Sequence, residues 1–334
     1  MVNQTETIVK KRDDTFDIIK GICILLMIVG HCPVSILGII IYSFHMPVFF
    51  FIAGYFFKQN GFWKCASSGI RRLLIPFACV YIFCIAIAYV IEYFGWFSKI
   101  VMSYIEYKNP VECALLMSKG LPVWFLVSLF WCRMLFFLVR KKRNDVVIFA
   151  VVIIAAILAV NLYNYFKLPL MFYPSVAALG FFVLGHVLAS RNIFSKEKKW
   201  RVFPLLLCAW VICISTGKSL VLGRCEYSGF YILDILGALG IFVSLYLVVK
   251  NCSTKSISWN ILKWCGVNSL IILCVHSVEL NFVDFNAVKR WLLPVFFPYE
   301  LYIAIAFRLA FDMVVTYALI KSRFVKRYIF AQYG

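Results

Sequence analysis

The stretch VVIFAVVIIAAILAVNLY, from Val146 to Tyr163, contains no charged residue. An uncharged apolar run of about 18 residues is long enough to cross the hydrocarbon core of a bilayer as an α-helix. The apolar residues are continuous rather than alternating, which favours a helix over a barrel strand. Within hydrocarbon, a helix satisfies its backbone hydrogen bonds internally. The stretch therefore predicts a transmembrane α-helix.

Similar apolar blocks follow one another along the whole chain of 334 residues, of which 63% are hydrophobic and 15% charged. Soluble domains carry roughly 45–50% apolar and about 25% charged residues. We therefore expect an all-α polytopic membrane protein, a bundle of about ten transmembrane helices. The predicted spans are residues 18–32, 36–57, 73–94, 122–139, 146–163, 171–189, 202–216, 229–249, 268–282 and 301–320.

The basic residues predict an orientation. With the N-terminus in the cytoplasm, 24 of the 34 Lys and Arg residues fall on the inner side of these spans and 8 on the outer side. This bias follows the positive-inside rule and places both termini in the cytoplasm. The net charge of +19 then reflects short clusters beside the membrane. Such clusters suit anionic lipid headgroups, and we expect no nucleic-acid partner.

The thirteen cysteines form no Cys-x-x-Cys pair, and most lie within predicted spans. Cysteine in that setting behaves as a small apolar residue. Neighbouring residues of a helix point about 100° apart, so the adjacent His31 and Cys32 are not expected to form an activated pair. We predict neither a metal site nor a catalytic thiol.

Histidines at membrane depth are the first candidates for chemistry, because polar groups are costly in hydrocarbon. His31 lies near the outer end of the first predicted span, and His45 lies at a similar depth on the second. Histidine exchanges protons near neutral pH, as acyl transfer to a hydroxyl requires. Hydrogen bonding between helices is the alternative interpretation.

His276 is a third candidate, about 12 Å along the ninth span from Asn268. It is either part of a site or a partner of a neighbouring helix. Asn268 and Ser269 are also candidates, although capping of this helix is their simpler role. Further polar residues at membrane depth, for which pairing between acids and arginines is the plain explanation, are Arg133, Asp234, Glu279, Arg308 and Asp312.

Several ordered segments resemble acyltransferase family 3, which includes membrane O-acetyltransferases such as the fucose 4-O-acetylase-like proteins. The segments that carry the resemblance are Asp17 to Ile22 leading to Gly30-His31, Phe44 to Tyr55, Arg71 to Pro76, Val123 to Leu126, and Gly266 to Ile272 leading to His276. Each is weak alone, but together and in order they are fairly specific.

The resemblance implies transfer of an acyl group, usually acetyl from acetyl-CoA, to a hydroxyl of a cell-surface or lipid-linked glycan. His31 matches the family's catalytic histidine, and Arg72 matches the second arginine of an Arg-x-x-Arg element whose first position is Gly69 here. The resemblance also implies a transmembrane acyltransferase domain over residues 18–320, between a cytoplasmic segment (1–17) and a basic cytoplasmic tail (321–334). A multi-pass protein of the bacterial cytoplasmic membrane is the expected setting.

Roles follow from this resemblance and from charge. Coenzyme A is anionic and cytoplasmic, so basic residues on the inner side are expected to bind the acyl-CoA. The expected donor-binding residues are Arg12, Lys20, Arg71 and Arg72, and the expected catalytic residues are His31, His45 and Asp17. Contact with lipid headgroups is the alternative for the arginines.

Two other functions stay open at this stage. A transporter or flippase would use charges such as Asp234 and Arg308 along its path, although no inverted repeat is visible. A membrane sensor or uptake module without catalysis is the third possibility.

The predicted orientation has a direct test. A reporter enzyme that is active only outside the cytoplasmic membrane, fused after Gly334, should be inactive because the 24-to-8 charge bias places the C-terminus inside. The same reporter inserted in the predicted outer segment between residues 95 and 121 should be active. A strongly active C-terminal fusion would contradict an even number of spans.

Overall fold

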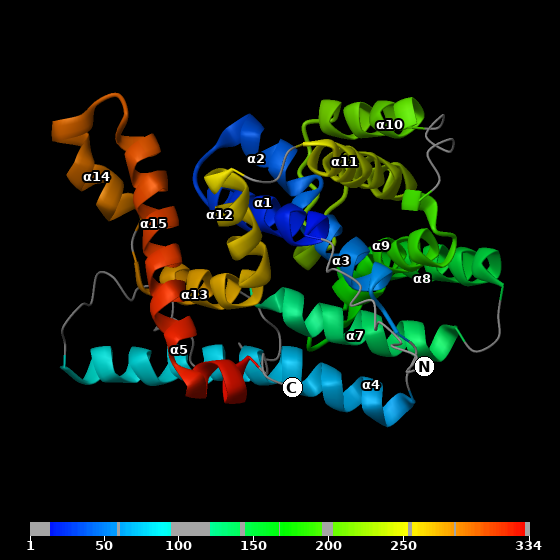
Figure 1. Ribbon diagram of the computed structural model, residues 1–334, viewed down its shortest axis with the longest axis horizontal. Helices are drawn as coiled ribbons and strands as arrows, with labels where there is room; N and C mark the ends of the chain where they lie inside the picture. The colour runs from blue at the N-terminus through cyan, green and yellow to red at the C-terminus, as the bar shows by residue number, and fades with distance from the viewer. Residues whose placement is uncertain are drawn as a thin grey trace, which may run out of the picture.

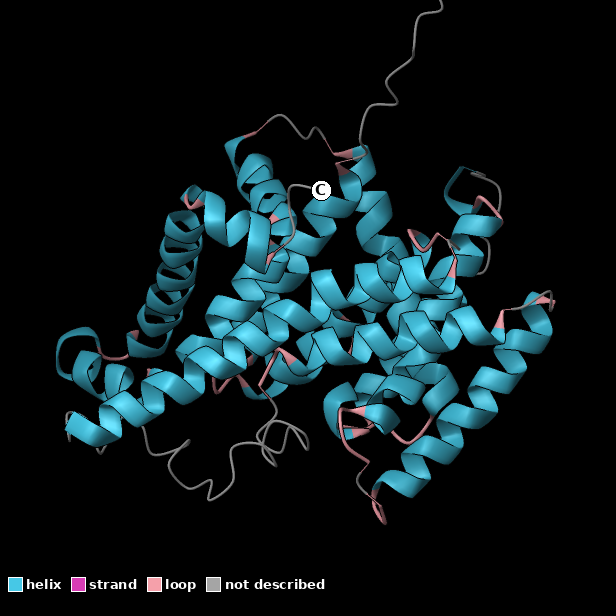
Figure 2. Ribbon diagram, turned by 90° about the horizontal axis from the view of Figure 1, so that it is seen from below, coloured by secondary structure: helices cyan, strands magenta, loops and turns pink. Residues whose placement is uncertain are grey.

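The computed structural model describes residues 14–58, 61–94, 121–140, 144–166, 168–195, 203–252, 256–283 and 285–330 (Figure 1). Figure 2 shows helices joined by loops throughout this described part. Outside the helices, an isolated β-bridge joins Val221 and Glu226. The predicted all-α fold is confirmed.

The helices are numbered as in Figure 1. The α-helices are α1 (Thr15–Gly30), α2 (Ser35–Tyr42), α3 (His45–Tyr55), α4 (Phe62–Gly69), α5 (Ile75–Phe94), α7 (Trp124–Val139), α8 (Asp145–Tyr163), α9 (Phe172–Ser190), α10 (Phe203–Ser215), α11 (Tyr231–Asn251), α12 (Ile257–Val267), α13 (Ser269–Phe282), α14 (Phe285–Phe296) and α15 (Glu300–Lys321). The short turns are η1 (Ile70–Leu74), η2 (Ile193–Ser195), η4 (Leu222–Arg224) and η5 (Val325–Ile329).

Six helical segments in the described residues are long and apolar enough to cross a bilayer: Ser35–Tyr55, Phe62–Ile87, Asp145–Tyr163, Phe172–Ser190, Tyr231–Asn251 and Glu300–Lys321. The pair α12 and α13 would add a seventh if it is one broken span, and α7 and α10 are shorter apolar helices. The chain is thus a multi-pass membrane protein. The count of ten spans and the cytoplasmic termini remain predictions.

The ninth predicted span, 268–282, coincides with α13, but the structure adds a helix before it. A separate apolar helix, α12, precedes α13, and the two meet at Asn268 with a bend of 75°. The Asn268 side chain does not cap α13; its amide donates instead to the carbonyl oxygen of Trp264 at 2.9 Å. The predicted capping by Asn268 is therefore wrong, because its side chain binds the last turn of α12.

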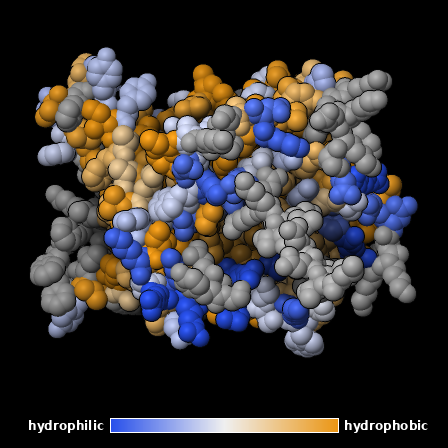
Figure 3. Space-filling view, viewed as in Figure 1, coloured by the Kyte–Doolittle hydropathy of each residue, from blue (hydrophilic) through white to orange (hydrophobic). Residues whose placement is uncertain are grey.

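Several helices expose apolar side chains on their outer faces. On α8 the exposed residues repeat at helical spacing: Val147, Val151, Ile154, Leu158 and Leu162. Exposed apolar stripes of this size would be unfavourable in water. In Figure 3, apolar side chains gather along the upper and left margins of the molecule, while hydrophilic ones lie across the centre and lower part of the view. These surfaces fit a bilayer as the surrounding solvent.

Glycines allow two helix pairs to approach at backbone distance. A Cβ on Gly21 of α1 would overlap the carbonyl oxygen of Leu262 in α12, and one on Gly266 would overlap that of Asp17. In the same way, a Cβ on Gly54 of α3 would overlap the Phe182 carbonyl of α9. Small residues drive such packing in membranes, where apolar burial gives little net attraction between helices.

Helix α1 lies at the centre of the packing that matters for function. It packs on α12 and α3 along its length, and it also contacts α2, α11, α13 and α15. In Figure 1, α15 runs steeply past α13, which lies across the view. The end of α1 at His31 therefore meets residues from α13 and α15.

Replacing Gly54 tests the close packing of α3 on α9. Gly54→Ala should destabilise the protein by about 1–3 kcal/mol, because the added methyl group forces two backbones apart. Gly38→Ala is the matched control, since the nearest atom to its Cβ is Val34 Cγ2 at 3.9 Å. Thermal unfolding of the purified protein in detergent measures both. Equal midpoints for the two variants would show that this packing is not tight.

Candidate active site at the end of helix α1

His31 follows the last residue of α1 and is held by its own helix. Its Nδ1 lies 2.8 Å from the carbonyl oxygen of Met27, one turn earlier. A carbonyl only accepts hydrogen bonds, so Nδ1 carries the proton. In a neutral imidazole this leaves the lone pair on Nε2, the form that acts as a base or nucleophile. The end of α1 thus fixes the tautomer of His31.

His276 of α13 lies beside His31, with 5.2 Å between the ring centroids. Its Nδ1 is 2.8 Å from Asp312 Oδ2 of α15 and 3.2 Å from Glu279 Oε2 of its own helix. The side chain is fully buried, and its Nε2 has no hydrogen-bond partner within the described part of the chain. Tertiary structure thus joins two of the predicted candidates, His31 and His276.

Arg308 of α15 connects this pair to the backbone of α1. Its Nε donates to Glu279 Oε1 at 3.0 Å, and its Nη1 donates to the His31 carbonyl oxygen at 3.3 Å. A second weak contact joins Nη1 to Cys32 Sγ at 3.6 Å. The side chain of Arg308 is 97% shielded from solvent, as its exposed fraction is 3%. A cation this deeply buried requires such partners.

The spacing in sequence explains how four groups converge. His276 and Glu279 are three residues apart on α13, and Arg308 and Asp312 are four apart on α15. Residues at these separations lie on one face of a helix. We call His276, Glu279, Arg308 and Asp312 the buried tetrad. Each helix contributes one basic and one acidic member.

The tetrad also has donor atoms at metal-ligand spacing. One atom each from His276, Glu279 and Asp312 lies within 4.8 Å of the others. However, the contacts of His276 at 2.8 and 3.2 Å are hydrogen-bond distances, and Glu279 already pairs with Arg308. These ion pairs hold the cluster together, although Glu279 Oε2 and Asp312 Oδ1 have no hydrogen bond among the described residues. We assign no step of the chemistry to a metal.

His45 lies behind a tyrosine as seen from His31. The ring of Tyr42 is 6.1 Å from that of His31 and 5.1 Å from that of His45. His45 is buried, and its Nδ1 lies 2.7 Å from the Ile41 carbonyl oxygen. The sequence placed the two histidines at similar depth, and the structure connects them through Tyr42. The Tyr42 ring thus lies close to both histidines.

Asp17 lies at the opposite end of α1. It is buried and forms an ion pair with Lys20 at 2.7 Å. Fourteen residues separate it from His31, which corresponds to about 21 Å of helix. The structure therefore does not bring Asp17 to the histidines. Its contact with Lys20 associates it with the cavity described next.

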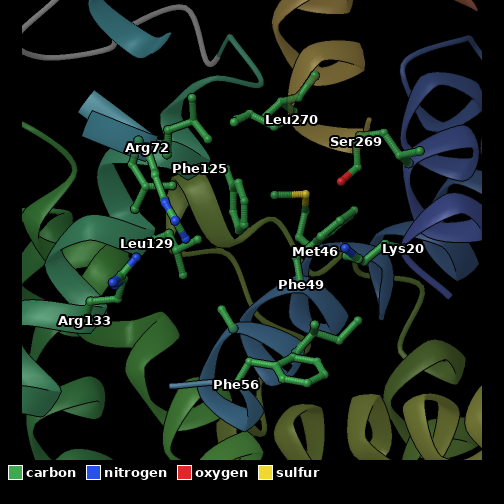
Figure 4. Close-up of a pocket in the computed structure, with 16 residues that line it drawn as sticks. Lys20, Met46, Phe49, Phe56, Arg72, Phe125, Leu129, Arg133, Ser269 and Leu270 are labelled. Carbon is green, nitrogen blue, oxygen red and sulfur yellow. The ribbon is translucent and has the colours of Figure 1, made fainter. Parts of the chain in front are cut away.

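A cavity of about 330 Å³ lies near this N-terminal part of α1. Its polar lining residues are Lys20, Arg72, Arg133 and Ser269. Figure 4 shows Lys20 and Arg72 extending into it from opposite sides, with Arg133 beside Arg72. The remaining walls are apolar and include Ile24, Met46, Phe49, Phe125 and Leu270. A cationic rim over apolar walls suits an amphipathic anion.

Other expected donor residues lie elsewhere. Arg71 is exposed on η1 and does not line the cavity. Arg12 lies outside the described residues. Asn268 is buried at the bend between α12 and α13, whereas its neighbour Ser269 reaches the cavity. The structure therefore joins Lys20, Arg72 and Ser269 of the predicted set.

Sequence reasoning missed the roles of four residues. Glu279, Arg308 and Asp312 were assigned only to general pairing, and Arg133 was not assigned to a cavity. The spacing of His276 with Glu279 and of Arg308 with Asp312 was a usable signal, because it puts each pair on one face. Nothing in the sequence indicated that these faces meet at His31.

Among the described cysteines, Cys32 touches the site through its weak contact with Arg308. The described cysteines form no disulfide, and most are buried. Outside the membrane helices, burial raises the pKa of the Cys225 thiol to about 12, so this thiol stays protonated near neutral pH. His186 packs against the rings of Phe57 and Phe136, away from the site. These findings agree with structural roles.

Comparison with known proteins gives a family. No curated protein and no solved structure matches the chain. The family model for the Acyltransferase domain (Acyl_transf_3) matches residues 13–319, which is most of the chain and includes both His31 and the buried tetrad. The chain therefore belongs to acyltransferase family 3.

Proposed function

We propose that the protein transfers an acetyl group from acetyl-CoA to a hydroxyl of a cell-surface or lipid-linked glycan, in the bacterial cytoplasmic membrane. The observation that carries this proposal is the His31 side chain, whose Nδ1 is bonded to the Met27 carbonyl so that Nε2 is free to accept a proton. Family membership supports acyl transfer in general. Acetyl-CoA as the donor, acetyl as the acyl group and a glycan hydroxyl as the acceptor are proposed here.

The cavity at the inner end of α1 is the proposed donor site. Lys20 and Arg72 would bind the coenzyme A phosphates, and the apolar walls would hold the uncharged arm. Lys20 and His31 are eleven residues apart on one helix, or about 16 Å. The extended pantetheine arm would follow α1 from these cations towards His31 and place the thioester there.

At His31 the acceptor hydroxyl would attack the thioester carbonyl. His31 Nε2 takes the hydroxyl proton as the carbon–oxygen bond forms. The carbon–sulfur bond then breaks, and the coenzyme A thiolate leaves with the proton that His31 Nε2 had accepted, which returns His31 to its uncharged form. The acceptor would enter from the opposite face to the donor, since the cations lie on the predicted inner side. In an alternative route, His31 Nε2 itself carries the acyl group briefly before the acceptor takes it. The next experiment distinguishes this route from general base catalysis.

Replacing His31 tests the proposed base. Membranes containing the protein, incubated with radiolabelled acetyl-CoA, should transfer label to glycan. His31→Ala should lower the rate by about 10²–10⁴-fold if His31 acts as a general base, and should abolish transfer if it carries the acyl group. Donor affinity should stay unchanged. A His31→Ala protein that inserts, binds donor and transfers acetyl at the parental rate would refute this role.

Replacing Arg72 tests the donor site. Arg72→Gln keeps much of the bulk but removes a charged hydrogen bond, so acetyl-CoA affinity should fall by about tenfold or more. Arg71→Gln is the matched control, because Arg71 is adjacent but outside the cavity. Isothermal titration of both variants with acetyl-CoA measures the effect. Equal affinities would reassign Arg72 to contact with lipid headgroups.

A further inference from the structure

The buried tetrad contains an unequal number of acids and fixed cations. Glu279 and Asp312 are carboxylates, and Arg308 is a guanidinium that does not lose its proton. Their exposed fractions are 4%, 0% and 3%. With a neutral His276, the group carries one net negative charge in a setting where unbalanced charge is costly. One additional proton makes the group neutral.

His276 is the group placed to hold that proton. Its Nδ1–H lies 2.8 Å from Asp312 and 3.2 Å from Glu279, so the additional proton resides on Nε2, which has no hydrogen-bond partner among the described residues. Two carboxylates at hydrogen-bond distance stabilise an imidazolium. Glu279 in turn is paired with Arg308 through its other oxygen, so it does not need the proton itself.

We propose that His276 is a positioning residue that holds the proton of the buried tetrad and thereby keeps the adjacent His31 uncharged. A positive charge on His276 opposes a second one on His31, because the ring centroids are 5.2 Å apart. An uncharged His31 has the free Nε2 that a base or nucleophile needs. The catalytic role of this proton rests on the proposed function, whereas its location on His276 does not.

The other groups around His31 act in the same direction or are neutral. Arg308 of α15 donates to the His31 carbonyl and adds positive charge. Tyr42 of α2 faces the ring, and His45 of α3 is the more distant ionisable neighbour. The acids Glu279 and Asp312 both contact His276, and Glu279 is also paired with Arg308. His276 is therefore the neighbouring charge best placed to disfavour a proton on His31.

Removing the imidazole should move the proton. In His276→Gln the two acids and Arg308 again carry one net negative charge, and His31 becomes the nearest group able to take the proton. The glutamine amide can still donate to Asp312, which protects the fold. In Asp312→Asn the charges of Glu279 and Arg308 balance, so His276 no longer needs the additional proton. His31 then loses the positive charge of its neighbour His276, but no net negative charge attracts a proton to it. This second variant should show a smaller effect.

The experiment follows the chemistry of His31 itself. Diethyl pyrocarbonate modifies uncharged imidazole, and mass spectrometry of the purified full-length protein gives the rate at His31. At pH 7, His276→Gln should slow modification of His31 by about tenfold or more, as expected for charges about 5 Å apart in a medium of intermediate polarity. Asp312→Asn should fall between this variant and the parent.

Raising the pH separates protonation from lost access. If His31 holds a proton in His276→Gln, its modification rate should recover towards the parental value at pH 9. His186→Gln is the matched control, since His186 packs against phenylalanines away from the site. It should leave the rate at His31 unchanged. Unchanged modification of His31 in His276→Gln, or slow modification that persists at pH 9, would overturn the inference.

Transfer assays distinguish this inference from the proposed function. If the parent transfers acetyl, His276→Gln should lower kcat at pH 7. The KM for acetyl-CoA should change little, because His276 does not line the proposed donor cavity near Lys20. If the parent shows no transfer activity, the proposed function is refuted. The modification rates at His31 still show whether His31 holds a proton. A parental kcat in His276→Gln would refute the role of His276 alone.

Discussion

The ion pair between Arg308 and Glu279 is the interaction on which the site depends. A guanidinium cannot be buried between helices without a partner, and its removal from water is compensated only by good geometry. Arg308 meets this need with a bond of 3.0 Å to Glu279 and a second to the backbone of His31. One side chain therefore joins α15, α13 and the end of α1. The orientation of His31 relative to His276 follows from that junction.

Helix α1 links two chemically different regions. Its N-terminal part carries Lys20 at the cationic cavity, and its C-terminal end carries His31 beside the buried tetrad. The backbone contact of Gly21 with α12 fixes this helix, because a side chain at that position would separate the two helices. A donor that binds at one end and reacts at the other would need a support of this rigidity.

Part of the site was predictable from the chain. Lys20, Arg72 and His31 were selected by charge, depth and resemblance, and the structure places the two cations at one cavity. Asp17 was grouped with the histidines, although helical geometry puts it at the far end of α1. Arg133 was missed, because a lone arginine in an apolar helix gives no sign of which cavity it faces. The membrane class and the family were both within reach of the sequence.

The sequence by itself determined that the chain is a helical multi-pass membrane protein, because apolar runs such as 146–163 admit only that solution in hydrocarbon. It also placed His276 with Glu279, and Arg308 with Asp312, since helical spacing is local. Only the tertiary structure decided that these two faces meet at His31. The bend of 75° at Asn268 and the crossing of α15 over α13 bring them together. The contact between His31 and His276 joins residues more than 240 positions apart, and no local pattern encodes it.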